Sequence, residues 1–407
     1  MKAKNKYQKI FIALPAMNEV ENMPAIISDI RGQTFKNFEL FVCVNQPDDF
    51  WNDQDKKNIC ENNEQTINLL KRITDFPITI IDKSSHGNGW TGKKFGVGWA
   101  RKVCMDSINE KADENDLIIS LDADTRFSEN YFSSLIDNFN SNPGITALSV
   151  PYYHRLVEDE IANRAILHYE IYMRYYSINL WRIKNPYSFS ALGSAIVLPV
   201  KSYRHIGGIT PHKSGEDFYF LQKLCKTGKI LCRNSEKVFP AARFSDRVFF
   251  GTGPAMIKGS KGDWSSYPIY DYTFFDEINS TFDLFPKLFT EEITTPMTSF
   301  LQAQFNTTEL WEPLRKNFKT QDQFVKACQN KVDGLRILQF LKTKQMENTL
   351  SDEENLISFL FNYYDKTELE NLGINFNEFS FSNSSIGDLD RMRDYLINKE
   401  TNEMVGY

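Results

Sequence analysis

The 407-residue sequence predicts an α/β protein, with a mostly parallel sheet flanked by helices and a helical C-terminal extension. Short apolar runs alternate with helical patterns over the first 120 residues, which is typical of parallel strands joined by crossover helices. Beyond residue 274 the apolar residues recur mainly at helical spacing. Hydrophobic residues make up 41% of the chain, which is enough for a substantial core.

The predicted strands are short apolar runs that end at proline or at polar residues. They comprise residues 9–14, 39–44, 77–81, 117–121, 145–150 and 193–199. Apolar residues at helical spacing, or polar helix-compatible sequence, predict helices over residues 20–31, 53–73, 93–110, 129–139, 161–181 and 217–226. In such a sheet the carboxyl ends of the strands form the ligand-binding crevice, so residues that follow the strands are the first candidates for a site.

The C-terminal third of the chain has mainly helical patterns, for example over residues 332–341 and 356–363. We therefore expect two domains, a sheet-containing domain over residues 1–266 and a helical extension over residues 267–407. This extension could bind an acceptor, dock a partner or cap the sheet. The sequence does not distinguish these roles.

Composition and charge exclude several classes. The formal net charge of −6 gives a nucleic-acid partner no electrostatic support. The six scattered cysteines contain no Cys-x-x-Cys pair, which favours reduced thiols in a cytosolic protein. No apolar run approaches 18 residues, and the basic N-terminus lacks a cleavage site, so we expect neither a membrane span nor a signal peptide. The expected location is cytoplasmic, with at most peripheral contact at the inner face of a membrane. The oligomeric state is left open.

Two acids, Asp122 and Asp124, follow the strand predicted over residues 117–121. In an extended chain their side chains would face the same way, because side chains alternate with period two. Two such carboxylates can hold a divalent metal ion against a phosphate. A solvated acidic turn is the simpler alternative.

A glycine-rich loop, Gly87-x-Gly89-x-x-Gly92, lies between a strand and a helix and matches the dinucleotide fingerprint. An NAD-dependent oxidoreductase is therefore an alternative function. Against it, five residues separate the strand from the loop, the loop follows the third strand, and Asp124 would have no role. Lys93, beside this glycine-rich backbone, could instead contact a phosphate or a sugar, or it could be simply solvated.

A second acid pair, Glu216-Asp217, stands where the helix over residues 217–226 begins. Acids in the first turn stabilise a helix through its dipole, so this pair also has a purely structural interpretation.

These motifs together resemble the family 2 glycosyltransferases of the GT-A (nucleotide-diphospho-sugar transferase) fold, over roughly residues 7–255. The matching segments are Pro15-Ala16-Met17-Asn18-Glu19, Gly92-Lys93-Lys94-x-Gly96, the D-x-D motif Asp122-Ala123-Asp124, the "ED" motif Gly215-Glu216-Asp217, and the loop containing Arg243 and Arg247.

The resemblance implies a role for each motif. Asp217 would be the general base, supported by Glu216. Asp124 and Asp122 would bind Mg²⁺ or Mn²⁺, with His212 as a weaker third candidate. The residues implied in binding the nucleotide and donor are Pro15, Ala16, Asn18, Glu19, Asn45, Asp82, Lys93, Asp122, Arg243 and Arg247.

The implied reaction is a metal-dependent, inverting transfer of one sugar from a nucleotide-sugar donor to a hydroxyl of a glycan or lipid-linked acceptor. The enzyme would be of the hexosyltransferase type and would act in bacterial cell-surface polysaccharide or lipopolysaccharide synthesis. Two departures qualify this. The second strand ends Val44-Asn45-Gln46-Pro47 where many relatives have Asp-Asp-Gly-Ser, which leaves the nucleobase open. The Gln-x-x-Arg-Trp motif of processive relatives is absent, which favours single-sugar transfer. A catalytically silent nucleotide-sugar-binding protein of the same fold is a further alternative.

Overall fold

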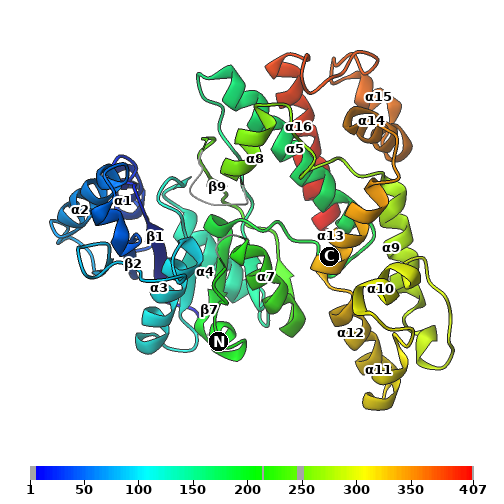
Figure 1. Ribbon diagram of the computed structural model, residues 1–407, viewed down its shortest axis with the longest axis horizontal. Helices are drawn as coiled ribbons and strands as arrows, with labels where there is room; N and C mark the ends of the chain where they lie inside the picture. Colours follow the sequence, from blue (N-terminus) through cyan, green and yellow to red (C-terminus); the bar gives the residue numbers. More distant parts are fainter. Residues whose placement is uncertain (1–5, 213–214, 245–251, 406–407) are drawn as a thin grey trace. The chain divides into compact units, whose positions relative to one another are not determined.

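The computed structural model describes residues 6–212, 215–244 and 252–405 (Figure 1). The chain forms two compact units. Unit 1 comprises Met1–Ile166 and Phe189–Gly262, and unit 2 comprises Leu167–Ser188 and Asp263–Tyr407. The domain boundary after residue 266 stays a prediction. Arg247 lies outside the described residues.

Unit 1 is built on a seven-stranded sheet with the order β3-β2-β1-β4-β7-β6-β8. The strands are β1 (Ile10–Ala16), β2 (Phe38–Asn45), β3 (Ile78–Lys83), β4 (Leu117–Ser120), β6 (Ala147–Ser149), β7 (Ile196–Pro199) and β8 (Ile230–Leu231). β7 runs antiparallel to β4 and β6, and the other pairs are parallel. The predicted class, a mostly parallel α/β sheet, is confirmed. A two-stranded sheet of β5 (Arg126–Phe127) and β9 (Val238–Phe239) was not predicted.

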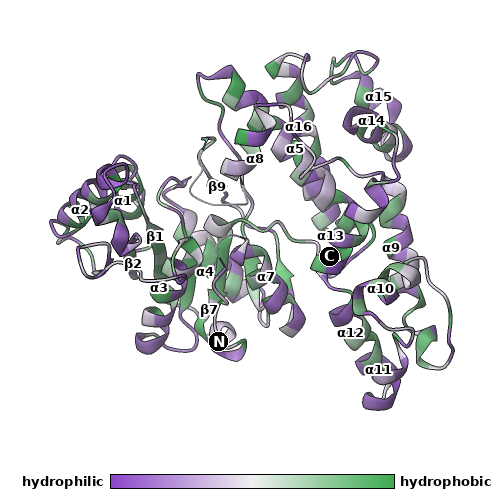
Figure 2. Cartoon of the chain, in the orientation of Figure 1, coloured by the Kyte–Doolittle hydropathy of each residue, from purple (hydrophilic) through white to green (hydrophobic). Residues whose placement is uncertain are grey.

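The central strands form the core because they are apolar on both faces. Every residue of β1 and β2 is buried, as expected for parallel strands covered by helices on both sides. Figure 2 shows the hydrophobic colour concentrated along these strands and the hydrophilic colour on the helices around them. The carboxyl ends of β1, β2, β3 and β4 therefore emerge together at one edge of the sheet.

The helices of unit 1 lie between these strands in the sequence, except α8, which follows the last strand. They are α1 (Met23–Arg31), α2 (Lys57–Leu70), α3 (Val97–Lys111), α4 (Tyr131–Ser141), α6 (Val200–His205), α7 (Glu216–Thr227) and α8 (Thr252–Gly259), with 3₁₀ turns η1 (Asp48–Asn52) and η2 (Gly193–Ala195). The helix predicted from residue 93 begins only at Val97, because Gly92 and Gly96 have φ of 68° and 108° and interrupt the helical backbone. The strand predicted from residue 193 begins at Ile196, because η2 precedes it.

Unit 2 is helical, which confirms the predicted nature of the C-terminal region. Its helices are α9 (Tyr272–Leu284), α10 (Thr298–Phe305), α11 (Glu312–Asn317), α12 (Gln321–Lys331), α13 (Gly334–Gln345), α14 (Asp352–Tyr363), α15 (Lys366–Glu370) and α16 (Ile386–Val405), with the 3₁₀ turn η3 (Lys287–Phe289). Several begin at a side-chain cap. Ser351, for example, forms a capping box with Glu354 at the start of α14.

The long helix α5 (Glu160–Arg182) begins in unit 1, and its greater part belongs to unit 2. Within unit 2 it contacts α16 through buried charges. Arg174 donates from Nη2 to Glu170 Oε1 at 2.9 Å and from Nη1 to Glu400 Oε2 at 2.6 Å. Arg393 Nη1 lies 3.7 Å from Glu170 Oε2. These paired charges join two helices that are far apart in the sequence.

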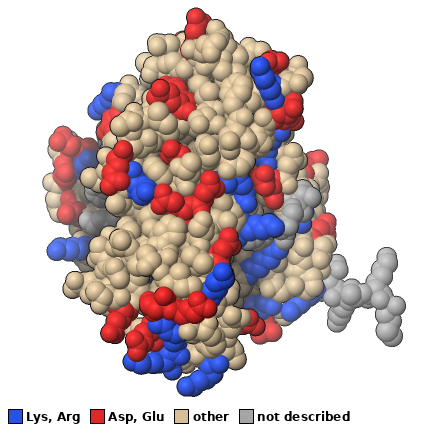
Figure 3. Space-filling model, turned by 90° about the vertical axis from the view of Figure 1, so that its right-hand side faces the viewer, with Lys and Arg blue, Asp and Glu red and all other residues tan. Residues whose placement is uncertain are grey.

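Two features concern the apolar length of the helices and the distribution of charge on the surface. Among the helices of the described ranges, none is both long and apolar enough to span a membrane. On the face drawn in Figure 3, acidic and basic side chains are interspersed between uncharged residues.

Candidate active site

The glycine-rich loop is closed by an acid of η1. The Asp48 Oδ1 atom accepts hydrogen bonds from the backbone N–H groups of Gly87 at 2.8 Å and Gly89 at 3.3 Å. A Cβ on residue 89 would lie 2.7 Å from Asp48 Cα, so only glycine allows this approach. A dinucleotide fingerprint needs such N–H groups for its pyrophosphate. Because a carboxylate of the protein already occupies them, the geometry disfavours the NAD-dependent alternative.

Asp82, at the end of β3, organises the same loop. Its Oδ1 accepts hydrogen bonds from the N–H groups of Ser84 at 3.0 Å and Ser85 at 2.9 Å, and Asn88 donates to its Oδ2 at 3.3 Å. Partial burial acts to raise the pKa of Asp82, but the hydrogen bonds from Ser85, Ser84 and Asn88 outweigh it and lower the pKa to about 2. Asp82 is therefore an ionised anchor of the loop, and its contact with a nucleotide stays a prediction.

Asn45, at the end of β2, is buried and bonded to its neighbours. Its Nδ2 donates to the carbonyl oxygen of Ala16 at 2.9 Å, and its Oδ1 accepts from Trp90 Nε1 at 3.1 Å. These bonds join the ends of β1 and β2 to the glycine-rich loop. The contact of this amide with a nucleotide stays a prediction.

The segment after β1 places an acid next to the D-x-D motif. Pro15 and Ala16 end the strand, and Asn18 adopts a left-handed backbone with φ 58° while its N–H donates to Asn63 Oδ1 at 2.8 Å. This turn buries the Glu19 carboxylate. Glu19 Oε2 accepts from Asn22 Nδ2 at 2.6 Å, which leaves Oε1 directed at Arg243.

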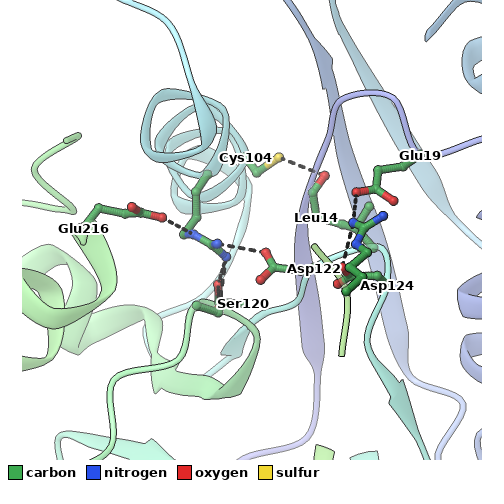
Figure 4. A network of polar contacts seen from close by, with 10 residues as sticks. Leu14, Glu19, Cys104, Ser120, Asp122, Asp124 and Glu216 are labelled. Atoms are coloured by element: carbon green, nitrogen blue, oxygen red, sulfur yellow. Dashed lines mark hydrogen bonds and ion pairs between the residues drawn. The ribbon is translucent and has the colours of Figure 1, made fainter. Parts of the chain in front are cut away.

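Arg243 contacts two other residues that the sequence analysis singled out, Glu19 and Asp124. Its Nη2 lies 2.5 Å from Glu19 Oε1 and 2.6 Å from Asp124 Oδ2 (Figure 4). Partial burial acts to lower the pKa of Arg243, but Asp124 and Glu19 outweigh it and raise the pKa. The side chain is 32% exposed, so this cation can also be reached from outside.

The two acids of the D-x-D motif do not face the same way, contrary to the expectation for an extended chain. β4 ends at Ser120, and the chain then turns, with the Thr125 N–H donating to the Asp122 carbonyl oxygen at 3.1 Å. Because of this turn, Asp122 pairs with Arg101 of α3 and Asp124 pairs with Arg243 (Figure 4).

Arg101 is the principal residue that the sequence reasoning missed. Its side chain is 2% exposed, and the guanidinium donates from Nη2 to Asp122 Oδ1 at 2.9 Å and from Nε to Glu216 Oε1 at 3.3 Å. Its Nη1 donates to Ser120 Oγ and to the Gly193 carbonyl oxygen, the latter at 3.0 Å. One buried cation therefore connects both acid motifs (Figure 4).

The sequence contains a signal for this arrangement. Arg101 shares the buried face of α3 with Ala100, Cys104 and Ile108. An arginine on an apolar helix face requires buried anions, and the acids of the two motifs were candidates for that role. Gly193 completes the fit, because a Cβ there would lie 2.6 Å from Arg101 Nη2.

Asp217 stands in the first turn of α7, which begins after Gly215 with φ 73°. The Phe218 N–H donates to Asp217 Oδ1 at 2.8 Å. Burial, and then the neighbouring Glu216, raise the pKa of Asp217 to about 7, against the lowering effects of the Phe218 N–H and Arg101. A carboxylate with a pKa near neutrality can both accept and release a proton under physiological conditions, which suits a general base.

The two candidate metal-binding acids, Asp122 and Asp124, are each paired with an arginine. Over the described ranges, no group of three or more His, Cys, Asp or Glu side chains is placed to hold an ion. Mg²⁺, however, is usually held by one or two carboxylates together with substrate phosphates, so Asp122 and Asp124 have suitable donor chemistry. The His212 ring lies 4.6 Å from that of Tyr219, and its role as a ligand stays a prediction. Lys93 is exposed in the loop before α3.

Residues 117–256 match the family model described as Glycosyl transferase family group 2. The matched segment contains both acid motifs and Arg243. Over these residues the chain matches a glycosyltransferase family domain. The expected resemblance and the enzyme class are thereby confirmed, and the mostly parallel sheet with flanking helices agrees with the GT-A fold that the resemblance implied. No curated protein sequence matches this glycosyltransferase.

Several solved structures are similar at low identity. The mannosyltransferase PcManGT from Pyrobaculum calidifontis, in complex with GDP-Man and Mn²⁺, is 12% identical with a TM-score of 0.39, covering 97% of this chain and 86% of its own. S. aureus TarS is 10% identical with a TM-score of 0.39, covering 82% and 55%. GalNAc-T7 with UDP, GalNAc and Mn²⁺ is 11% identical with a TM-score of 0.40, covering 78% and 56%. This glycosyltransferase thus spans little more than half the length of the last two.

Proposed function

We propose that this glycosyltransferase transfers a single sugar from a nucleotide-sugar donor to an acceptor hydroxyl, with a divalent metal and with inversion. The observation that carries the proposal is the connection of the two acid motifs through Arg101. Through Arg101, Asp122 is joined by hydrogen bonds to Glu216 at the start of the helix that carries Asp217.

The donor side of the proposed site is acidic, with cationic residues beside it. Asp122 and Asp124 would hold Mg²⁺ or Mn²⁺, which when bound offsets the negative charge that gathers on the leaving nucleoside diphosphate. Arg243, which pairs with Asp124 and Glu19 here, has the planar guanidinium that suits a bidentate contact with phosphate. A phosphate beside Asp124 would therefore meet a cation that is already positioned.

The acceptor side depends on Asp217. In the inverting reaction a base on the face of the sugar opposite the leaving group takes the proton of the acceptor hydroxyl. Glu216 is paired with Arg101 and is unsuited to accept that proton, whereas Asp217 has a pKa of about 7. We assign the base to Asp217 and the support of its position to Glu216.

The proposed acceptor is a glycan or lipid-linked sugar of a bacterial cell-surface polysaccharide, and the proposed location is cytoplasmic. This part rests on the motif resemblance. No residue of unit 2 is assigned to the acceptor.

A panel of nucleotide-sugars with and without Mn²⁺ tests the proposal. At least one donor should raise the melting temperature in a metal-dependent manner and should be turned over. Asp124→Asn should weaken metal-dependent nucleotide binding at least tenfold, in line with the loss of a metal-ligating carboxylate. The matched control is Asp137→Asn, an exposed acid on α4, which should bind as the wild type does. If no donor shifts the melting temperature under either condition, the proposed function is wrong. Binding without turnover of any donor would favour the catalytically silent alternative.

A further inference from the structure

We propose that Arg101 is a positioning residue that fixes two acids relative to each other. They are Asp122, assigned to metal and donor binding, and Glu216, assigned to the support of Asp217. The inference rests on the proposed function of the two acid motifs. It extends that function to a residue of α3 that lies outside both motifs.

The guanidinium is used at all three of its nitrogens. Nη2 reaches Asp122, Nε reaches Glu216, and Nη1 reaches Ser120 and the Gly193 carbonyl oxygen. These partners come from β4, the turn after it, η2 and the start of α7. A planar fork with fixed donor directions can satisfy such a set, whereas the single ammonium of lysine cannot.

Burial makes this arrangement specific. The side chains of Arg101 and Glu216 are 2% and 5% exposed, whereas that of Asp122 is 37% exposed. Asp122 is therefore held at Oδ1 from inside the protein and is open to solvent elsewhere. Burial acts to lower the pKa of Arg101, but Asp122 and Glu216 outweigh it and raise the pKa, so the cation stays charged.

A shared counter-ion has a consequence that two separate salt bridges would not have. If Arg101 moves, Asp122 and the start of α7 lose their positions together. Loss of its geometry should therefore weaken binding of the metal–nucleotide pair and also slow turnover when donor is saturating. A residue that only packs α3 against the sheet would lower the melting temperature and leave both properties of the folded protein unchanged.

The test compares Arg101→Lys with Lys102→Met. Lysine keeps the positive charge but lacks the planar arrangement of N–H donors. Lys102 is the next residue on α3 and pairs at the surface with Asp106 at 2.8 Å, so its removal deletes a cation that contacts neither acid motif. Affinities for Mn²⁺–UDP and Mn²⁺–GDP are measured by titration calorimetry well below each melting temperature. Turnover is measured with the donor that is active with the wild type.

We expect Arg101→Lys to bind the preferred nucleotide about tenfold more weakly and to turn over at least tenfold more slowly at saturating donor, and Lys102→Met to match the wild type. Wild-type affinity and turnover in folded Arg101→Lys overturn the proposal. A wild type that binds no nucleoside diphosphate in the presence of Mn²⁺ overturns the proposed function instead.

A thermodynamic cycle covers the case in which Arg101→Lys is too unstable for the binding and turnover assays. Arg101→Met, Asp122→Asn, Glu216→Gln and the two double variants with Arg101→Met are compared by unfolding in denaturant. Both carboxylates should show coupling to Arg101. The absence of coupling to either one overturns the proposal.

Discussion

The pKa of Asp217 leads to a prediction about the pH dependence of turnover. With a pKa of about 7, roughly a tenth of the carboxyl is ionised at pH 6 and about nine-tenths at pH 8. Turnover at saturating donor should therefore rise about tenfold over this interval, because only the carboxylate can accept the acceptor proton. An aspartate of ordinary pKa would be fully ionised throughout and would give a flat profile.

The neighbouring acid provides a test of the cause. Glu216 raises the pKa of Asp217 through its negative charge, so Glu216→Gln should move the ascending limb to lower pH. Asp217→Asn should abolish turnover at every pH while the metal–nucleotide affinity stays within about twofold. The assay is nucleotide release from the active donor between pH 5 and 9. A control at each pH verifies that the enzyme remains stable over the time of the assay.

Stability gives an independent measurement of the same group. The folded-state pKa of Asp217 lies above the ordinary value of 3.8, so the protonated form stabilises the fold below about pH 4. That contribution is lost as the pH rises to about 7, by up to about 4 kcal/mol for a shift of this size. Asp217→Asn should remove this part of the slope. The reasoning would be refuted if turnover rose with pH only below pH 5. It would also be refuted if Asp217→Asn left the pH dependence of the free energy of unfolding unchanged.

Two further predictions concern packing. Gly193→Ala would place a Cβ 2.6 Å from Arg101 Nη2, so it should lower the free energy of unfolding by about 1–3 kcal/mol. Gly387→Ala, whose Cβ would meet no atom closer than 3.6 Å, should be neutral or slightly stabilising, and equal losses from the two variants would contradict the close approach. The Tyr270 hydroxyl is buried with no hydrogen-bond partner among the described residues, so Tyr270→Phe should not destabilise the protein. Tyr175→Phe removes a 2.6 Å bond to the Tyr270 carbonyl oxygen and should cost about 1 kcal/mol, and thermal unfolding of both variants distinguishes these outcomes.

The sheet and the acid motifs could be predicted from the sequence because each depends on local pattern. Apolar runs located β1, β2 and β4, and acids after strand ends located Asp122 and Asp124. The partners of these acids could not be predicted in the same way. Periodicity places Arg101 on the buried face of α3, but it does not indicate which anion meets a buried cation.

Local pattern also failed where distant backbone decides the outcome. The loop containing Gly87 and Gly89 matches a phosphate-binding fingerprint, yet Asp48, some 40 residues earlier, takes its N–H groups. The expectation that Asp122 and Asp124 face the same way assumed an extended chain after β4. A turn with the Thr125 N–H bonded to the Asp122 carbonyl oxygen changes that geometry.

The ion pairs between α5 and α16 have a consequence for synthesis on the ribosome. Arg174 emerges 226 residues before its partner Glu400. At about 5–20 residues per second, roughly 10–45 s pass before that partner is made. During this interval a helix bearing charges that the native protein buries must stay solvated or be shielded by a chaperone. Unit 2 can thus complete its folding only when the last helix has left the ribosome.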